Sequence, residues 1–172
     1  MLGVDLTVDG EEWAAVAVYA PVQGAERLTW LESDDGWRAA QERVREGKKV
    51  IMGGDWNCVA MPGEDTVGSP NYANVGGQRL ENRWASWGMW DVWRHQRVAP
   101  LVAGITRWRG GMGSRIDRIL VSANLQKRIS KTEVRPCALS DHSGVWTKLK
   151  GVGAVQRPRT KRYRVNRALA DS

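Results

Sequence analysis

The sequence predicts an α/β fold whose functional site lies at the ends of its strands. Short apolar runs typical of strands outnumber the helical segments, and two or three helical patterns are interleaved with them. Most of the polar motifs follow directly after the apolar runs. Because ligands of open α/β sheets bind beyond the strand ends, these motifs are the first candidates for function.

The N-terminal third of the chain predicts a hairpin, a helix and a buried strand. Residues 4–7 and 13–19 have the composition of strands and flank an Asp-Gly turn, which is typical of a hairpin. Residues 33–46 follow a helical pattern that a glycine ends. The apolar run 49–52 precedes two glycines and predicts a strand that is buried on both faces.

The middle of the chain predicts a long loop followed by short elements. Residues 55–77 are rich in Gly, Pro, Asn and Asp, and loops of this length in compact domains are usually functional or mobile. A short helix, another short element and four strands should follow, at residues 78–87, 91–93, 105–108, 115–122, 132–135 and 145–149. A glycine-rich turn should join the first two of these strands.

The positive charge of the chain is concentrated at its C-terminal end. The segment from Lys148 onward holds eight of the 26 basic residues and one of the 19 acidic residues, so it carries the whole net charge of +7. From Gly151 the chain also loses its apolar periodicity, so residues 1–150 form one predicted domain and residues 151–172 form a basic tail. Such a tail fits contacts with nucleic-acid phosphates, and a solvated linker is an equally good interpretation.

The composition also excludes several classes of protein. No apolar run is long enough to span a membrane, so we expect no membrane partner. The N-terminus lacks the basic and apolar regions of a signal peptide. Cys58 and Cys137 have no metal-binding or disulfide spacing, which is typical of a reducing compartment. We therefore expect an intracellular protein.

Three polar clusters carry the strongest functional signal, although each alone is also typical of a turn or a cap. They are Gly54-Asp55-Trp56-Asn57, Ser114-Arg115-Ile116-Asp117 and Ser140-Asp141-His142. Together with Tyr19-Ala20-Pro21 upstream, their order resembles the endonuclease/exonuclease/phosphatase superfamily over about residues 4–149. The resemblance implies a two-sheet α/β sandwich that hydrolyses phosphodiesters with Mg²⁺ or Mn²⁺.

The resemblance also implies how the site residues divide the chemistry. Asp141 would contribute to the metal site. His142 would contact the phosphate or the attacking water, and Asp117 would orient its imidazole. Asp55 would orient or deprotonate the water, or protonate the leaving group. These alternatives for Asp55 remain open.

Further residues would bind the substrate. Asn57 and Tyr19 would donate hydrogen bonds to the phosphoryl oxygens. Thr106 and Ser140 are candidates for DNA contact or for support of the site. The glycine-rich hairpin is short and basic, and its candidate DNA-binding residues are Arg107, Arg109 and Arg115.

Other features resemble the endonuclease of LINE-type (non-LTR) retrotransposons. Residues 91–94 (Asp-Val-Trp-Arg), a threonine-tryptophan strand at 105–108 and the 114–117 motif occur in the order found in those enzymes. Residues 163–171 resemble the segment that joins such endonucleases to a reverse transcriptase. The resemblance implies DNA as a partner, an associated reverse transcriptase domain and, in a eukaryotic element, a nuclear location.

The sequence departs from the family at its N-terminal side. Members carry an asparagine motif and a glutamate that is the principal metal ligand, both upstream of the hairpin at residues 4–19. Glu11 and Glu12 lie beside the hairpin turn and do not match that glutamate. We therefore expect an N-terminally truncated domain with exposed apolar surface and weak activity.

Two other functions remain as alternatives. The chain could be a repair-type endonuclease or a phosphatase of the same superfamily. It could also be a non-catalytic remnant that binds nucleic acid, in which case binding would survive mutation of Asp55 and His142.

Overall fold

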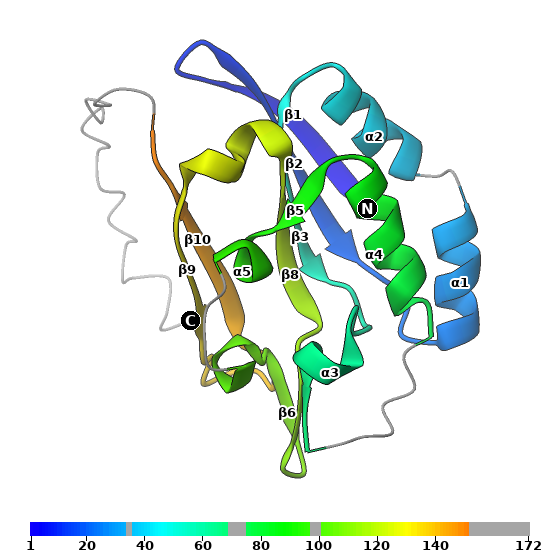
Figure 1. Cartoon of the computed structure of the whole chain (residues 1–172). Coiled ribbons are helices and arrows are strands. Elements are labelled where there is room, and N and C mark those ends of the chain that lie inside the picture. The colour runs from blue at the N-terminus through cyan, green and yellow to red at the C-terminus, as the bar shows by residue number, and fades with distance from the viewer. Residues whose placement is uncertain (34–35, 69–74, 97–100, 152–172) are drawn as a thin grey trace, which may run out of the picture.

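A computed structural model describes residues 1–33, 36–68, 75–96 and 101–151 of the chain (Figure 1). The predicted basic tail, apart from its first residue, lies outside the described residues. The segment that resembles a reverse transcriptase connection also lies outside them. In the described part, no helix is long and apolar enough to cross a membrane.

A five-stranded sheet forms the centre of the fold (Figure 1). Its strands, in spatial order, are β1 (Leu2–Val8), β2 (Glu11–Tyr19), β3 (Lys49–Asp55), β8 (Asp117–Ser122) and β5 (Met89–Asp91). The β2 and β3 strands are parallel, and the other neighbouring pairs are antiparallel. The predicted N-terminal hairpin is confirmed, with Asp9 and Gly10 at positive φ in its turn.

Three helices cover one face of this sheet. They are α1 (Gly24–Glu32), α2 (Trp37–Arg45) and α4 (Gly77–Ser86), and they pack over β2, β3 and β8 (Figure 1). Val50 and Met52 of β3 point toward the helices and are fully buried. Trp37 and Trp84 fill the space between the helices and the sheet, as expected of tryptophans that serve as core residues.

A second, smaller sheet lies on the opposite face. It pairs β9 (Ile129–Arg135) with β10 (Gly144–Leu149) in antiparallel register. Its apolar side chains pack with Ile51, Ile119 and Val121 of the central sheet. The helices α5 (Val92–Gln96) and η2 (Ala123–Arg128) complete this layer. The predicted two-sheet α/β sandwich is therefore confirmed.

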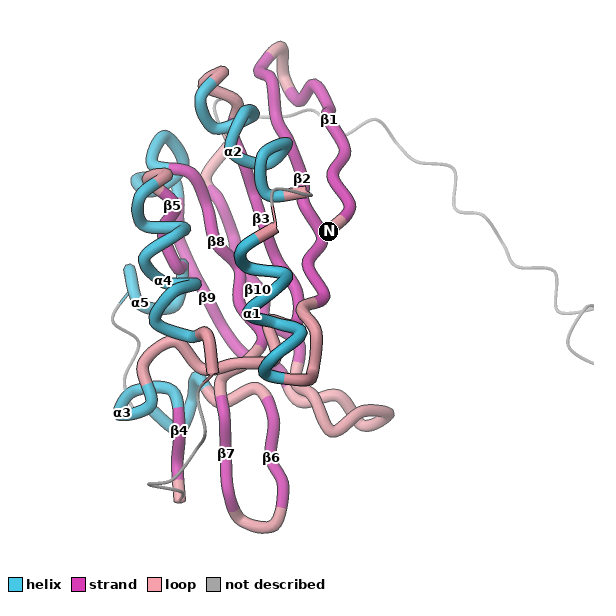
Figure 2. Tube along the Cα trace, turned by 90° about the vertical axis from the view of Figure 1, so that its right-hand side faces the viewer, coloured by secondary structure: helices cyan, strands magenta, loops and turns pink. Residues whose placement is uncertain are grey.

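A third small sheet projects from one end of the sandwich. It consists of β4 (Thr66–Val67), β7 (Met112–Ser114) and β6 (Arg107–Arg109), and the β6–β7 hairpin extends beyond the body of the molecule (Figure 2). The short helices α3 (Pro62–Asp65) and η1 (Leu101–Gly104) lie nearby in the chain. The strand that the sequence predicts over residues 105–108 corresponds to β6, which begins two residues later, because Ile105 and Thr106 lie outside it.

The helical region before β3 differs from the prediction. The structure has two helices, and the second begins at Trp37 rather than at residue 33. The first helix was not predicted because its N-cap, Gln23, forms no side-chain cap. Arg27 instead holds its start through hydrogen bonds to the carbonyls of Pro21, Val22 and Val75, contacts that sequence patterns do not reveal.

The face of the sheet opposite the helices is covered at β3 and β8 but exposed at β1. Four alternate residues of this edge strand are exposed by 39 to 72 %: Leu2, Val4, Leu6 and Val8. They are in register with Ala17, Ala15, Trp13 and Glu11 of β2 and therefore share one face with them. The apolar surface expected from the sequence is present at this edge of the sheet, where Figure 2 shows β1 as the outermost strand.

Candidate active site

The site residues meet where β2 and β3 end and β8 begins. Asp55 ends β3 and is the register partner of Asp117, the first residue of β8. Tyr19 ends β2 and is the register partner of Asp55. All three occupy positions on the face opposite the helices, since side chains alternate along a strand. Sheet pairing alone thus brings together residues that lie 98 positions apart in the chain.

A histidine and two carboxylates form the centre of the site. The imidazole Nδ1 of His142 lies 2.9 Å from Oδ2 of Asp117. One ligand atom from each of Asp55, Asp117 and His142 lies within 4.8 Å of the others. All three side chains are partly buried, so they remain open to a substrate. The predicted pairing of Asp117 with His142 is therefore present in the structure.

The turn after β3 fixes the position of Asp55. A Cβ atom at Gly54 would lie 1.9 Å from the Val18 carbonyl oxygen, so the chain passes β2 closely only because this residue is glycine. The Asp55 carboxylate accepts a hydrogen bond of 2.8 Å from the backbone N–H of Asn57. The Asn57 side chain donates a 2.8 Å hydrogen bond to the Ala20 carbonyl. The backbone of Asn57 has a left-handed φ of 48°.

Burial raises the pKa of Asp55, and the negative charge of Asp117 raises it further. The N–H of Asn57 acts in the opposite direction because it stabilises the charged carboxylate. Two carboxylates that face one another in this way favour either a shared proton or a cation between them. Carboxylate oxygens and an imidazole also suit a Mg²⁺ or Mn²⁺ ion.

Thr106 supports the site from within and is not exposed to DNA. Its side chain is completely buried, and its hydroxyl accepts bonds of 3.1 Å from the backbone N–H groups of Ile116 and Asp117. Its carbonyl accepts a 2.6 Å bond from the N–H of Ser143. Thr106 thus joins β8 to the loop that carries His142. These contacts are consistent with the prediction that Thr106 supports the site. The prediction that Thr106 contacts DNA is wrong, because its side chain is buried.

Arg115 is also not available to DNA. Its side chain is 4 % exposed and lies between two buried carboxylates, Asp65 and Asp91. The guanidinium of Arg118, which is fully buried, contacts Asp65 at 2.9 Å. Because a buried charge needs a partner, Arg115 turns inward and not toward the groove of a substrate. Of the other two predicted hairpin arginines, Arg107 is half-buried and Arg109 is exposed.

Asp65 lies in the predicted loop over residues 55–77, and no sequence motif marks it as a functional residue. Burial raises the pKa of its carboxyl, but the positive charges of Arg118, Arg115 and Arg94 outweigh this effect and lower it to about 2. A signal was available: two arginines within an apolar strand, Arg115 and Arg118, require buried acidic partners. The sequence does not say which acid supplies them.

The loop before β10 presents Asp141 beside the central cluster and not within it. Its exposed carboxylate accepts a 3.0 Å hydrogen bond from Arg107, and this bond lowers the pKa of Asp141. Ser140 accepts a 3.0 Å bond from the N–H of His142 and so shapes the same loop. Tyr19 is 69 % exposed at its strand end. The roles of Asp141, Ser140 and Tyr19 toward metal and substrate stay predictions.

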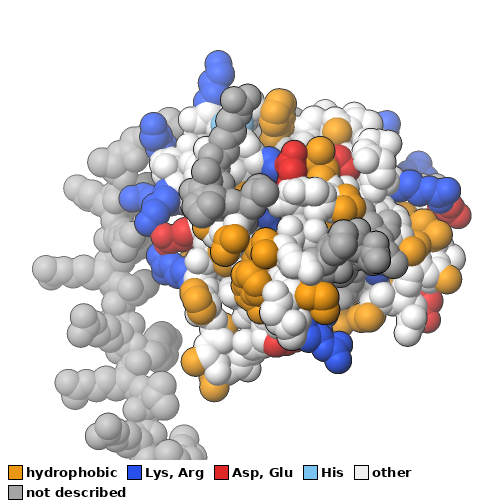
Figure 3. Space-filling view, turned by 60° about the horizontal axis from the view of Figure 1, so that its bottom comes forward, with side chains coloured by type: hydrophobic (Ala, Val, Ile, Leu, Met, Phe, Trp, Pro, Cys, Tyr) orange, Lys and Arg blue, Asp and Glu red, His pale blue; other side chains and the backbone are white. Residues whose placement is uncertain are grey.

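The end of the molecule that carries the site and the β6–β7 hairpin comes forward in Figure 3. Hydrophobic side chains are scattered over this view, and basic side chains lie mostly around its margin. The exposed Arg109 near the hairpin turn belongs to this end of the molecule.

The model of the Endonuclease/Exonuclease/phosphatase family matches residues 21–142, which include Asp55, Asn57, Asp117 and His142. The chain belongs to the endonuclease/exonuclease/phosphatase family. It is also similar to the Transposon TX1 uncharacterized 149 kDa protein of Xenopus laevis, with 30 % identity over 147 residues. That match covers 84 % of this chain and 11 % of the Xenopus protein. The predicted family is confirmed, with a transposon protein among its relatives.

Solved structures share the fold of this endonuclease/exonuclease/phosphatase chain. The 3′-5′ exonuclease NExo from Neisseria meningitidis has a TM-score of 0.68 and 18 % identity, covering 87 % of this chain and 65 % of NExo. The endonuclease domain of TRAS1, a telomere-specific non-LTR retrotransposon, has a TM-score of 0.58 and 20 % identity, covering 86 % and 62 %. An AP endonuclease from Archaeoglobus fulgidus has a TM-score of 0.67 and 20 % identity, covering 84 % and 63 %. The chain thus spans less than two thirds of each of these structures.

Proposed function

We propose that the chain is the C-terminal part of a DNA-nicking phosphodiesterase, the endonuclease of a retroelement. The observation that carries the proposal is the Asp117–His142 pair facing Asp55 at the strand ends. The similarity to a transposon protein and the fold shared with the TRAS1 endonuclease support this substrate class. An intracellular, nuclear location and an associated reverse transcriptase domain belong to the same proposal.

Each group in the cluster has a distinct role in hydrolysis. With His142 neutral, its Nδ1–H donates to Asp117, and this leaves Nε2 free to accept a proton from water or to contact the phosphate. Asp55 lies opposite and orients the water or gives a proton to the leaving oxygen. Burial and the charge of Asp117 raise the pKa of Asp55, and this direction favours a proton-transfer role for its carboxyl group.

A divalent cation, Mg²⁺ or Mn²⁺, would stabilise the charge that develops on the phosphoryl oxygens. Asp141 would contribute to the site of such an ion from the neighbouring loop. Asp141 would then exchange its exposed partner Arg107 for the cation. Asn57 and Tyr19 would donate hydrogen bonds to the phosphoryl oxygens from the ends of the adjacent strands.

We also propose that a β-segment outside the described residues covers the exposed face of β1 and β2. This face offers four exposed apolar side chains on an edge strand, and Trp13 of the neighbouring β2 packs in one cluster with Ile129 and Leu149 of the two-stranded sheet. Strands added beside β10 would bury that face and could bring the missing asparagine and glutamate motifs to the metal site. Without them, we expect Mg²⁺ binding and activity to be weak.

The proposal can be tested by measuring the nicking of supercoiled plasmid with Mg²⁺, with Mn²⁺ and with a chelator. The 172-residue chain is used in excess over the plasmid. His142→Ala should lower nicking by about 10²-fold or more. His95→Ala is the matched control, since it removes the other histidine, which is exposed and outside the cluster. Equal loss in the two variants, or nicking that persists with the chelator, would refute the proposal.

A second candidate is a repair-type endonuclease, which the fold shared with the Archaeoglobus AP endonuclease favours. The two candidates differ in substrate. Cleavage of an abasic duplex far faster than an intact duplex would support repair. Hydrolysis of a phosphoinositide in preference to either would indicate a phosphatase. Salt-dependent DNA binding without any cleavage, unchanged by mutation of Asp55 and His142, would indicate a non-catalytic binding module.

A further inference from the structure

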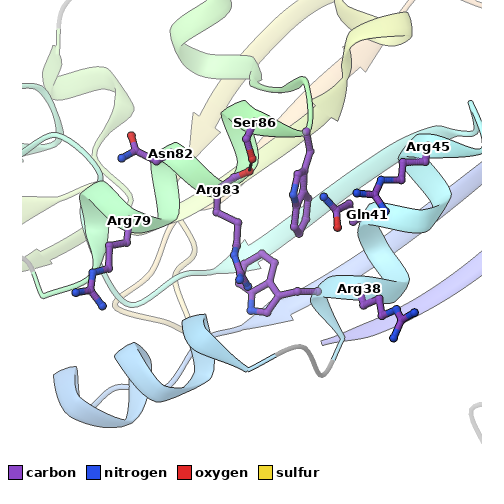
Figure 4. Close-up of a pocket in the computed structure, with 9 residues that line it drawn as sticks. Arg38, Gln41, Arg45, Arg79, Asn82, Arg83 and Ser86 are labelled. Atoms are coloured by element: carbon purple, nitrogen blue, oxygen red, sulfur yellow. Dashed lines mark hydrogen bonds between the residues drawn. The ribbon is translucent and has the colours of Figure 1, made fainter.

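A groove between α2 and α4 lies on the helix-covered side of the molecule (Figure 4). Its volume is about 630 Å³, within the range of small-ligand sites. The described residues that line it come from these two helices and their ends, and they include no member of the Asp55, Asp117 and His142 cluster. The groove is therefore a separate feature from the candidate active site.

Arginines dominate the lining of this groove. Arg38 and Arg45 come from α2, and Arg79 and Arg83 come from α4. No acidic side chain is present among the described residues of the lining. Residues 1–147 carry equal numbers of basic and acidic residues, so four arginines without an acid represent a marked local concentration of charge.

The charge of the groove is only partly compensated within the described chain. Arg79 forms an exposed ion pair of 2.5 Å with Glu32, the only one of the four arginines with such a pair among the described residues. The guanidinium of Arg83 lies 5.1 Å from the ring centre of Trp37, and its buried Nη1 has no hydrogen-bond partner there. Figure 4 shows Arg45 extending from α2 toward α4, and Arg83 extending from α4 into the space between the helices. An anionic ligand would supply the missing counter-charge.

The shape of the groove favours a short stretch of one strand. Arg38 and Arg45 are seven positions apart on α2, which corresponds to about 10 Å along the helix axis. This length accommodates at most about three phosphates of one strand, because the axial spacing of roughly 3.4 Å in a duplex increases when a single strand is extended. The groove is concave, whereas a duplex presents its phosphates on a convex surface. The indole of Trp87 in the lining offers an apolar surface between the arginines.

We propose that the α2–α4 groove binds single-stranded nucleic acid through its phosphate backbone, without preference for sequence. Guanidinium groups bind phosphates through paired hydrogen bonds, and an aromatic side chain between basic groups suits the alternation of phosphates and bases. DNA and RNA share this backbone, so either strand is a ligand. The groove would hold a displaced or template strand away from the catalytic cluster.

The test is fluorescence anisotropy with the whole chain and labelled oligonucleotides of about 12 nucleotides. Binding is measured in a chelator at roughly 50 to 200 mM salt, so that the result does not depend on catalysis. Arg38→Gln/Arg45→Gln should weaken binding of single strands about tenfold and reduce the salt slope by about 1.4, for two contacts. DNA and RNA strands should respond alike.

The matched control is Arg43→Gln/Lys127→Gln, which removes the same charge at residues outside the groove. Arg43 pairs with Asp5, and Lys127 is exposed on η2. This control should change binding less than about twofold, because long-range charge is screened. Arg38→Lys/Arg45→Lys keeps the charge and should retain most of the salt slope. Binding by this variant would show that substitution at the two positions leaves the protein folded, so that the loss in the Gln variant is a loss of charge contacts.

Three results would overturn the inference. The first is an equal loss of affinity in the Gln variant and in the control, which would place the binding on overall charge. The second is a larger loss of affinity for a duplex than for a single strand when Arg38 and Arg45 are changed to Gln. The third is displacement by polyglutamate at lower concentration than by an oligonucleotide of similar charge, which would identify an acidic protein segment as the ligand.

Discussion

Thr106 links the two motifs that form the Asp117–His142 pair. Its hydroxyl accepts two backbone hydrogen bonds at the start of β8, and its carbonyl holds the loop before β10. We predict that Thr106→Val destabilises the protein by about 1 to 3 kcal/mol, because two N–H groups lose their acceptor. Nicking should fall as well, since Asp117 is displaced.

Thr106→Ser is the control, because it keeps the hydroxyl in a smaller side chain. Urea unfolding measures the stability of both variants, and plasmid nicking measures their activity. A Val variant as stable and active as the Ser variant would show that these hydrogen bonds do not position Asp117.

Asp65 makes the stability of the protein depend on acid. Its folded pKa of about 2 lies below the ordinary value of 3.8, so its ion pairs stabilise the fold above about pH 4. This contribution, roughly 2 kcal/mol, is lost as the pH falls from 4 toward 2. Urea unfolding across this range should show the loss in the parent protein. In Asp65→Asn the loss should be smaller, although that variant is less stable throughout. The same acid sensitivity in both proteins would contradict the prediction.

At the scale of elements, the end of β3 depends on one glycine. We predict that Gly54→Ala destabilises the fold by more than about 3 kcal/mol or prevents folding, because its Cβ would overlap the Val18 carbonyl and its φ is 147°. Gly53→Ala is the neighbouring control, since its Cβ would meet the nearest atom, on Ile119, at 3.4 Å. Thermal melting compares the two, and equal melting temperatures would contradict the close approach of β3 to β2.

Elements with strong local patterns could be predicted from the sequence, and those held by distant contacts could not. The N-terminal hairpin and β3 carry their own turn and apolar signals. Helix α1 depends on Arg27 bonding to the carbonyl of Val75, 48 positions away. In the site, Asp55 and Asp117 sit in short motifs after apolar runs. Asp65, one of the two partners of Arg115, lies 50 positions away in the sequence, so only the folded structure shows this pairing.

At the scale of the whole molecule, charge and apolar surface are separated. The net-neutral body has arginines gathered between α2 and α4, while exposed apolar side chains occupy the opposite face at β1. The candidate active site lies at the strand ends, apart from the arginine groove. This arrangement is consistent with a nuclease module that binds nucleic acid at more than one place and packs against further β-structure.

The central claim is that Asp117, paired with His142, serves phosphodiester hydrolysis. The most direct measurement is the rate of plasmid nicking by an excess of the 172-residue chain, in Mg²⁺ and in Mn²⁺. Asp117→Asn is compared with Asp5→Asn, which changes an exposed carboxylate on β1. We predict slow nicking by the parent, a loss of about 10²-fold or more in Asp117→Asn, and little change in Asp5→Asn. Nicking by Asp117→Asn at the rate of the parent, or an equal loss in Asp5→Asn, would contradict the claim.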